Sequence, residues 1–409
     1  MQLSYVIVSH NRRDTLLATL EVLHATTPLD GSDWEAWVVD NASTDGSAEA
    51  VAARYPGVHL IRRQQNEGVW ARSLAFAHCR GRYVVLLDDD SYPQPPADWR
   101  MTGAKSTTVR RSMDYLEAHP RCAAVVGRCV LPTGGAEACA LPGVMLSGAV
   151  CLRRAALEMV GGFRPEFFRK AGEYDLSFRL WQAGWSVERF EDVVYCHDKY
   201  PGGRSAALAF KMDLRNNLIL VERFFPLRYR RAYRKDYLQR YGAFARHEGQ
   251  TRAMAEAVAE ARQWAEHERK RGRQTLGPAV LETLLMWGRQ KREVAEWADA
   301  HRVERVVIAD YGKNLFATWR AAVRAGLEVV AIAENHPAFA GMSYRGVTVL
   351  PDAEALALPH DGVVLSNVNP AQLPAREAAV RSAVDRPVLC LWRPRELGQR
   401  PVPALAQAG

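Results

Sequence analysis

The segment Tyr83-Val-Val-Leu-Leu-Asp-Asp-Asp90 is an apolar run of strand length that ends in three consecutive carboxylates. Three further runs of strand length precede it, and stretches with an amphipathic helical pattern separate the four. Strand–helix alternation at this spacing predicts an α/β fold with a mostly parallel, doubly wound sheet. The expected strands are 3–9, 36–40, 58–62 and 83–88, and the expected helices are 14–25, 47–55 and 69–79.

Polar residues follow each of these four predicted strands. In open parallel sheets, ligands bind just beyond the carboxyl ends of the strands, so these residues are candidates for one site. Carboxylates that leave a strand end together can hold a hard divalent cation, which in turn neutralises a diphosphate. Acidic triplets are also common on ordinary surfaces, so the neighbouring motifs must decide. The strand ends read Ser9-His-Asn11, Asp40-Asn41, Arg62-Arg-Gln64 and Asp88-Asp-Asp90.

Length and composition describe a globular chain of several domains. The 409 residues suggest two or three domains, and 48% hydrophobic with 24% charged residues excludes a mostly disordered protein. The chain contains no run of 18 apolar residues that could cross a bilayer, and its N-terminus resembles a first strand rather than a signal peptide. Seven dispersed cysteines without a Cys-x-x-Cys pair indicate reduced thiols. We therefore expect a cytoplasmic protein.

The character of the sequence changes twice after the first half. A region rich in Arg, Glu, Ala and Gln predicts helices at 215–225, 227–247, 251–271 and 278–300. A second strand–helix series then predicts a small Rossmann-like domain with strands at 305–310, 328–333, 347–350, 362–366 and 387–392. Its first turn lacks Gly-x-Gly-x-x-Gly, which leaves little support for NAD and leaves a structural, dimerising or ligand-binding role open. The predicted divisions are 1–225, 226–300 and 301–409.

Several motifs of the first 225 residues occur in a recognisable order and spacing. Together they resemble the inverting family-2 glycosyltransferases, and this resemblance implies a GT-A fold for roughly residues 1–225. The first half supplies Val6-Ile-Val-Ser-His-Asn-Arg12, Val38-Val-Asp-Asn-Ala-Ser-Thr-Asp-Gly46, Asn66-Glu-Gly68 and Leu86-Leu-Asp-Asp-Asp90. The second half supplies Ser147-Gly-Ala-Val-Cys-Leu-Arg-Arg154, Val160-Gly-Gly-Phe163, Gly172-Glu-Tyr-Asp-Leu-Ser-Phe-Arg179, Val193-Val-Tyr-Cys-His197 and Arg215-Asn-Asn217.

The resemblance assigns a donor and metal site to the strand ends. It implies that Asp40 contacts the nucleotide base, that Asp88 and Asp90 are the outer carboxylates of an Asp-x-Asp signature, and that His197 completes a Mn²⁺ or Mg²⁺ site. Strand alternation turns the side chain of Asp89 to the other face, which makes it the weakest candidate of the triplet. Arg72 and Arg154 could meet phosphate charge or remain surface arginines. The implied donor-binding residues are Ser9, Asn11, Asp40, Asn66, Arg72, Asp88 and Asp89, and the implied metal ligands are Asp88, Asp90 and His197.

The resemblance also places a catalytic base at the start of a helix. Inverting transfer needs one carboxylate to deprotonate the acceptor hydroxyl, and the family usually places it in a Glu-Asp-x-Asp-Leu motif. Here the stretch is Gly172-Glu-Tyr-Asp-Leu176, so Glu173 stands where the family has Asp. Asp175 is the competing candidate, and a first-turn carboxylate that complements the helix dipole is its structural alternative.

The segment 223–235 is dense in arginine and aromatic residues. It could lie on an anionic membrane surface, or it could form a helical hairpin whose aromatic side chains pack on the catalytic domain. No nucleic-acid-binding motif accompanies it, and the net charge of +8 does not by itself select a partner.

Taken together, the sequence predicts a metal-dependent, inverting glycosyltransferase for cell-surface polysaccharide assembly. It would move a sugar from a UDP- or dTDP-linked donor to a glycan or lipid-linked acceptor, in the cytoplasm or at the inner face of the membrane, and homodimer formation stays open. The alternative functions are a non-catalytic sugar-binding scaffold and a sugar nucleotidyltransferase. A nucleotidyltransferase would need a glycine-rich loop after the first strand, which Ser9-His-Asn-Arg-Arg13 does not provide.

Overall fold

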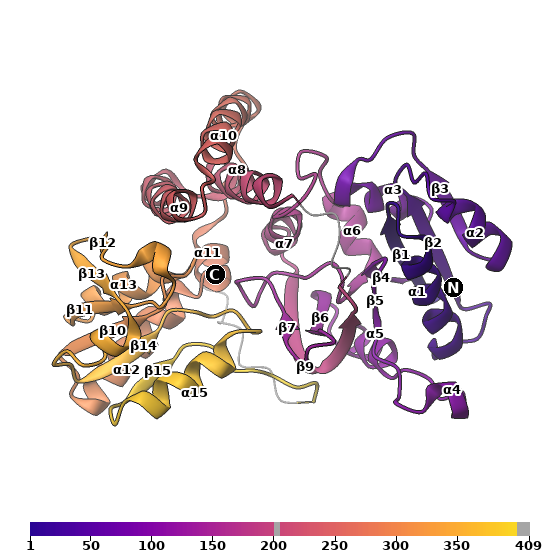
Figure 1. The fold of residues 1–409 in the computed structure, drawn as a ribbon. Helices are drawn as coiled ribbons and strands as arrows, with labels where there is room; N and C mark the ends of the chain where they lie inside the picture. Colours follow the sequence, from indigo (N-terminus) through magenta and orange to yellow (C-terminus); the bar gives the residue numbers. More distant parts are fainter. Residues whose placement is uncertain (200–204, 399–409) are drawn as a thin grey trace.

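The computed structural model describes residues 1–199 and 205–398. Two α/β units lie side by side, and a set of long helices stands between and above them (Figure 1). The first unit has a nine-stranded sheet of order β3-β2-β1-β4-β8-β6-β9-β5, with β7 paired to β6. The predicted α/β class is confirmed.

The four strands predicted from the first ninety residues form the parallel half of this sheet. They are β1 (Leu3–Ser9), β2 (Trp34–Asp40), β3 (His59–Arg62) and β4 (Tyr83–Asp88). β1 lies between β2 and β4, and its buried residues from Leu3 to Ile7 explain why this run is almost entirely apolar. Because all four strands run parallel, their carboxyl ends meet at one edge of the sheet.

Two of the three helices predicted here form almost as expected, and the third is shorter. Helices α1 (Arg13–Thr26) and α2 (Ser47–Arg54) follow β1 and β2. The expected helix over 69–79 is instead a 3₁₀ turn, η1 (Gly68–Arg72), followed by the single turn α3 (Ser73–Phe76). The Val69 N–H donates to the Phe168 carbonyl at 2.9 Å, so a tertiary contact fixes the start of this segment.

The second half of the sheet is mixed, and it brings a distant strand end next to β4. β8 (Val150–Arg153) lies antiparallel between β4 and β6 (Cys122–Val130), while β9 (Ser186–His197) runs parallel to β6. The short β5 (Ser91–Pro93) pairs with the end of β9. The remaining elements of this half are α4 (Trp99–Thr102), α5 (Thr108–Ala118), β7 (Ala136–Glu137), α6 (Arg154–Val160) and α7 (Gly172–Gln182).

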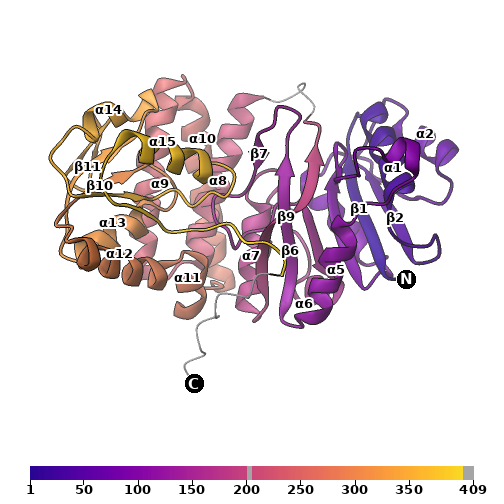
Figure 2. The same ribbon diagram turned by 90° about the horizontal axis from the view of Figure 1, so that it is seen from below.

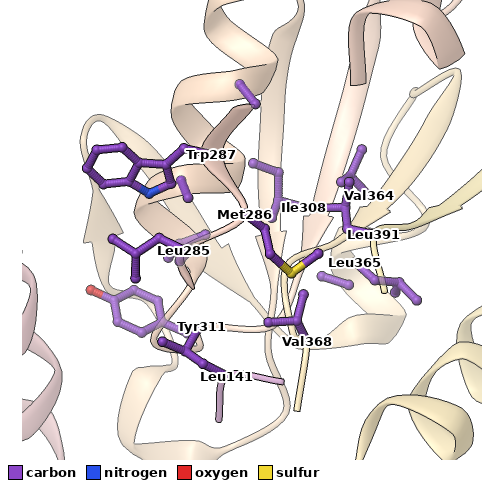
Figure 3. Close-up of a cluster of buried hydrophobic side chains, with 14 of the residues drawn as sticks. Leu141, Leu285, Met286, Trp287, Ile308, Tyr311, Val364, Leu365, Val368 and Leu391 are labelled. Atoms are coloured by element: carbon purple, nitrogen blue, oxygen red, sulfur yellow. The ribbon is translucent and has the colours of Figure 1, made fainter. Parts of the chain in front are cut away.

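Five helices connect the two units. Two of them match the predicted bounds, α8 begins nine residues earlier than predicted, and the expected helix over 278–300 is interrupted. The interruption lies at Leu285–Met286, where Met286 has a left-handed φ of 56° and both side chains turn into the hydrophobic core (Figure 3). The helices are α8 (Ala206–Phe224), α9 (Leu227–His247), α10 (Thr251–Arg271), α11 (Pro278–Leu284) and α12 (Trp287–His301).

The C-terminal unit is Rossmann-like, as predicted. Its sheet has the order β12-β13-β11-β10-β14-β15, and every pairing except that of β12 is parallel. The strands are β10 (Arg305–Ala309), β11 (Glu328–Ala333), β12 (Ser343–Tyr344), β13 (Val347–Leu350), β14 (Gly362–Leu365) and β15 (Val388–Cys390). The helices are α13 (Leu315–Arg324), η2 (Pro337–Phe339), α14 (Asp352–Ala355) and α15 (Leu373–Ala383).

The two units share a hydrophobic core. One cluster of buried apolar side chains runs from Leu141 of the first unit, through the connecting helices, to Tyr311 and Val368 of the second (Figure 3). After β15 the chain returns across the first unit (Figure 2). There the Glu191 N–H donates to the Arg395 carbonyl, and the Leu397 N–H donates to Asp192 Oδ1, each at 2.8 Å.

The aromatic residues of segment 223–235 belong to this shared core. Phe224, Phe225, Tyr229 and Tyr233 are buried, and the last two contact Trp287. The packing interpretation of this segment therefore holds, although the aromatic side chains pack against Trp287 of α12 and not only against the first unit. These aromatic rings are not placed to enter a membrane.

Candidate active site

A cleft of about 1170 Å³ opens at the carboxyl ends of the parallel strands. Eight of the residues predicted for the site line it, and Asp40, Arg72 and Asp175 do not. Residues of the loops around 136–140 and 168–171 and residues of the C-terminal unit complete its wall. The predicted residues that line the cleft are Ser9, Asn11, Asn66, Asp88, Asp89, Asp90, Glu173 and His197.

Two carboxylates and one imidazole converge at the centre of this cleft. Ligand atoms of Asp88, Asp90 and His197 all lie within 4.8 Å of one another, and His197 Nε2 is 3.1 Å from Asp90 Oδ1. The pairing of β5 with β9, which sets Ser91 opposite His197, produces this convergence across 107 residues of sequence. Oxygen and imidazole donors together suit Mn²⁺, so the residues fit the divalent cation that the sequence predicts.

A second carboxylate, which the sequence analysis missed, holds the other face of His197. His197 Nδ1 lies 2.8 Å from Glu137 Oε2, and Lys199 Nζ donates to Glu137 Oε1 at 2.5 Å. A carboxylate on the far nitrogen of a metal-binding histidine fixes the ring orientation and its tautomer. Burial lowers the pKa of His197, but the hydrogen bonds of the ring with Asp90, Cys129 and Glu137 outweigh burial and raise the pKa to about 12. No local motif around Glu137 could have predicted this contact.

The middle carboxylate of the triplet does not turn away from the site. β4 ends at Asp88, so the alternation of the strand stops before Asp89, and the expectation that Asp89 faces the other side is wrong. Arg12 Nη1 donates to Asp89 Oδ1 at 2.9 Å and to Asp90 Oδ2 at 3.0 Å. Burial raises the pKa of Asp89 to about 6, although Arg12 opposes this.

Short polar side chains join the loops that follow β1, β2 and β3 at one end of the cleft. Asn41 Nδ2 donates to Asn66 Oδ1 and to the Gly68 carbonyl, each at 3.0 Å, and Asn11 Oδ1 accepts from the Thr44 N–H at 2.7 Å. Gly68 has a left-handed φ of 72°, and a Cβ there would lie 2.1 Å from the Phe168 carbonyl oxygen. The Asn66-Glu-Gly68 motif is therefore a loop whose last residue lies so close to the Phe168 backbone that only glycine fits there.

The predicted donor ligands Arg72 and Asp40, and Arg154 as a possible phosphate contact, all make hydrogen bonds within the protein. Arg72 is fully buried and donates to Asp88 Oδ1 at 2.8 Å, so it orients that carboxylate instead of lining the cleft. Arg154 donates to the Gly81 carbonyl at 2.9 Å and pairs with Glu158, away from the cleft. Asp40 is buried, and its Oδ1 accepts from the Ser43 N–H at 3.3 Å. Base contact by Asp40 stays a prediction.

Glu173 points into the cleft at the first turn of α7. Ser147 Oγ donates to Glu173 Oε1 at 2.9 Å, which gives the Ser147-Gly148 motif a positioning function. The loop before α7 has left-handed φ values at Lys170 and Ala171, of 68° and 61°, which are uncommon for residues with side chains. Asn216 Nδ2 donates to the Arg169 and Lys170 carbonyls, each at 2.8 Å, and so holds this strained loop.

Asp175 lies on the opposite side of α7, with no exposed surface. Its Oδ1 accepts from Arg223 Nη1 at 2.7 Å, and its Oδ2 accepts from Arg179 Nε at 2.8 Å. Arg223 also pairs with Glu166 and Glu268, so Asp175 belongs to a buried ion network that ties α7 to α8 and α10. This placement argues against Asp175 as the base and replaces the helix-dipole explanation of its presence.

Several wall residues of the cleft come from parts of the chain where no site was predicted. They lie beyond Glu173 on the side of the connecting helices and of the C-terminal unit. Sequence spacing gives no sign of these contacts, because they depend on how the second sheet packs against the first unit. These residues are Asp213, Lys313, Asn369, Ala371 and Gln372.

The N-terminal part of the chain matches a known family. Residues 4–102 fit the family model described as glycosyl transferase family 2. The undecaprenyl-phosphate 4-deoxy-4-formamido-L-arabinose transferase of Enterobacter sp. (strain 638) is 29% identical over 146 residues, which cover 33% of this chain and 44% of that protein. The succinoglycan biosynthesis protein ExoO of Rhizobium meliloti (strain 1021) is 32% identical over 100 residues, covering 24% and 28% of the two chains.

A third curated relative is the putative teichuronic acid biosynthesis glycosyltransferase TuaG of Bacillus subtilis (strain 168). It is 32% identical over 92 residues, which cover 21% of this chain and 35% of TuaG. The matched segments therefore span less than half the length of these three relatives.

Solved structures of similar chains include S. aureus TarS 1-349 in complex with UDP-GlcNAc, with 15% identity and a TM-score of 0.49 over 88% of this chain and 99% of that one. The mannosyltransferase PcManGT from Pyrobaculum calidifontis in complex with GDP-Man and Mn²⁺ has 16% identity and a TM-score of 0.43, covering 79% and 86%. Within residues 1–199 and 205–398, no helix is both long and apolar enough to cross a membrane.

Proposed function

Residues 4–102 match the model of glycosyl transferase family 2, and from this premise we propose that the protein is a metal-dependent, inverting glycosyltransferase. Its donor is a UDP- or dTDP-linked sugar, and its acceptor is a hydroxyl of a glycan or a lipid-linked glycan. The observation that carries the proposal is that one cleft is lined both by the Asp88, Asp90 and His197 group and by Glu173.

The donor side of the cleft would bind the nucleotide diphosphate. Asp88, Asp90 and His197 would hold Mn²⁺ or Mg²⁺, and a bound divalent cation neutralises the charge of the leaving diphosphate. Arg72 and Arg12 fix Asp88 and Asp90 before substrate arrives, and Glu137 fixes the ring of His197. Preorganised ligands of this kind avoid the cost of ordering them during binding.

On the acceptor side, Glu173 would take the proton of the attacking hydroxyl. The hydroxyl oxygen forms a bond to the anomeric carbon while the bond from that carbon to the diphosphate oxygen breaks. A single displacement of this kind inverts the anomeric configuration and needs one base and no protonated acid. The Ser147 hydroxyl holds one oxygen of Glu173 and leaves the other available for the acceptor.

The names of the relatives support a function in cell-surface polysaccharide assembly. One is a transferase to undecaprenyl phosphate, and two are named for succinoglycan and teichuronic acid biosynthesis. We propose that the present chain also acts in cell-surface polysaccharide assembly. Its predicted location is the cytoplasm or the inner face of the membrane.

A thermal-shift panel tests the donor assignment. UDP, dTDP, GDP and CMP are each added at a hundredfold excess over Kd, with Mn²⁺ or with EDTA, and a true ligand should add about 2.7 kcal/mol to the free energy of unfolding. We expect UDP or dTDP to raise Tm in Mn²⁺ and EDTA to abolish the shift. Equal shifts in EDTA would contradict the metal site, and no shift with any nucleotide would contradict the proposed function.

Replacing His197 tests the metal site from the protein side. His197→Ala should lower transfer by about 10- to 100-fold, the range found when contacts around a bound metal are removed. The check is a Mn²⁺ titration of initial rates, in which the variant should need more metal for half-maximal activity. His301→Ala, at an exposed helix end, is the matched control. Unchanged kinetics with a lowered Tm would instead assign His197 a purely structural function.

A further inference from the structure

The C-terminal unit places one ammonium group in the cleft of the first unit. Lys313 lies in the turn between β10 and α13, and together with Asn369 and Gln372 it lines the same cleft as Glu173. The ammonium group of Lys313 lies over the ring of Tyr174, the residue after Glu173, with Nζ 5.2 Å from the ring centroid, a cation–π contact. The second unit therefore reaches the acceptor side of the site.

Lys313 forms no ion pair among the described residues, and Asp213 is the carboxylate whose charge acts on it. Nζ makes a long hydrogen bond of 3.4 Å to Asn217 Oδ1, and among residues 1–199 and 205–398 no carboxylate lies within 4.0 Å of it. Asp213 contributes attraction, but its oxygens already accept from Tyr241 and Asn217. Burial accordingly lowers the pKa of Lys313, because desolvation disfavours its charged form.

Asp213 attracts Lys170 as well as Lys313, so this one carboxylate faces at least two cations at the cleft wall. Lys170 lines the same wall of the cleft and adds a second cation, while Tyr174 and Asn217 are neutral. Lys170 also lies in the loop with left-handed φ values, and its carbonyl accepts a hydrogen bond from Asn216. This hydrogen bond stabilises the strained backbone conformation that places Lys170 at the cleft wall. A half-buried ammonium with one weak acceptor has hydrogen-bonding capacity for an anionic ligand.

We propose that Lys313, together with Lys170, forms a subsite for an anionic group of the acceptor, so that the enzyme uses a glycan bearing phosphate or carboxylate close to the hydroxyl that is glycosylated. The inference rests on the proposed function, because it concerns the acceptor of the same cleft. It gives the C-terminal unit a binding role that the sequence left open. Phosphate on a glycan, phosphate on a lipid carrier and the carboxylate of a uronic acid share the chemistry that this subsite recognises.

Ligand-observed NMR on the full chain can test this subsite with small probes. The probes are glycerol 3-phosphate, farnesyl diphosphate and methyl glucuronide, which represent the three sources of charge, with glycerol as the neutral control. Each probe is titrated with and without saturating UDP and Mn²⁺. The nucleotide occupies the donor site, so any binding of a probe phosphate at that site is lost and can be subtracted. Lys313→Met is compared with Lys313→Arg and with Lys235→Met, which removes an exposed lysine from α9.

We expect at least one anionic probe to bind the nucleotide-loaded wild type and to bind Lys313→Met at least tenfold more weakly. Lys313→Arg should recover part of the affinity, Lys235→Met should behave as wild type, and glycerol should not distinguish the variants. Tm of ligand-free Lys313→Met should change little, since Lys313 makes only one long hydrogen bond and no ion pair among the described residues, whereas a structural lysine would lower Tm when lost.

Two results separate this inference from the proposed function. If UDP and Mn²⁺ bind but no probe depends on Lys313, the anionic subsite is wrong and the glycosyltransferase proposal stands. If no nucleotide binds while the probes still depend on Lys313, the donor assignment fails and the subsite remains. Equal binding of every probe to wild type and Lys313→Met overturns the subsite in either case.

Discussion

Glu173→Gln should reduce glycosyl transfer by about 10²–10⁴-fold, the range expected when a general base is lost. The amide keeps the size of the side chain and can still accept from Ser147, so the loss reports proton transfer and not a change of shape. Donor binding should survive, because Glu173 lies on the acceptor side and makes no contact with the metal group. Rates must be measured at saturating donor and Mn²⁺, so that weakened binding is not mistaken for lost chemistry.

Asp175→Asn is the control on the same helix. It removes a buried negative charge that Arg179 and Arg223 share, and breaking a buried pair of this kind costs about 3–5 kcal/mol of stability. We therefore expect a lower Tm with a much smaller effect on the rate per folded molecule. If Asp175→Asn abolishes turnover in folded protein while Glu173→Gln retains most of it, the two assignments must be exchanged. If neither matters, the motif holds no base, and a sugar-binding scaffold becomes the better description.

Asp90→Asn should lower transfer by more than about a hundredfold, because even loss of a partner behind a metal ligand commonly costs 10- to 100-fold. The change removes one ligand charge and leaves Arg12 and His197 facing a neutral amide. Both the Mn²⁺ concentration for half-maximal rate and the nucleotide affinity in Mn²⁺ should worsen together. Isothermal titration of UDP or dTDP, with and without Mn²⁺, measures this coupling.

Asp98→Asn makes the same chemical change at an exposed carboxylate before α4 and should leave every parameter unaltered. Asp90→Glu retains the charge and should recover part of the metal response if the site tolerates one more methylene. A folded Asp90→Asn enzyme with full activity at wild-type Mn²⁺ concentrations would remove this residue from the metal site.

The local part of the fold follows from sequence. The strands from β1 to β4 were predictable because each is an apolar run bounded by polar residues, and because successive runs are joined by amphipathic helices. The Rossmann-like order of the second sheet follows from the same alternation. Elements whose limits depend on distant contacts were less predictable: η1 is tied to the Phe168 carbonyl, and the break at Met286 turns two apolar side chains into a core shared with another unit.

The predicted site divides in the same way. Motif order was sufficient to select Asp88, Asp90, His197 and Glu173, and the structure brings all four to one cleft. Motif order could not show that Arg72 turns inward to Asp88, or that Asp175 is enclosed by arginines. Both arginine and aspartate are equally compatible with a substrate contact and with a buried ion pair, and only the packing around them distinguishes the two.

Sequence by itself therefore determined the elements, the family resemblance and the residue types that the chemistry requires, since these depend on short-range periodicity and on ordered motifs. Tertiary structure decided which side chains share the cleft: Glu137 behind His197, Ser147 on Glu173, and Lys313 from the second unit. The physical reason is that these contacts join residues 26 to 139 positions apart, which the strand pairing of the first sheet and the packing of the second unit bring together. Neither hydrophobic periodicity nor local spacing carries information about contacts at that range.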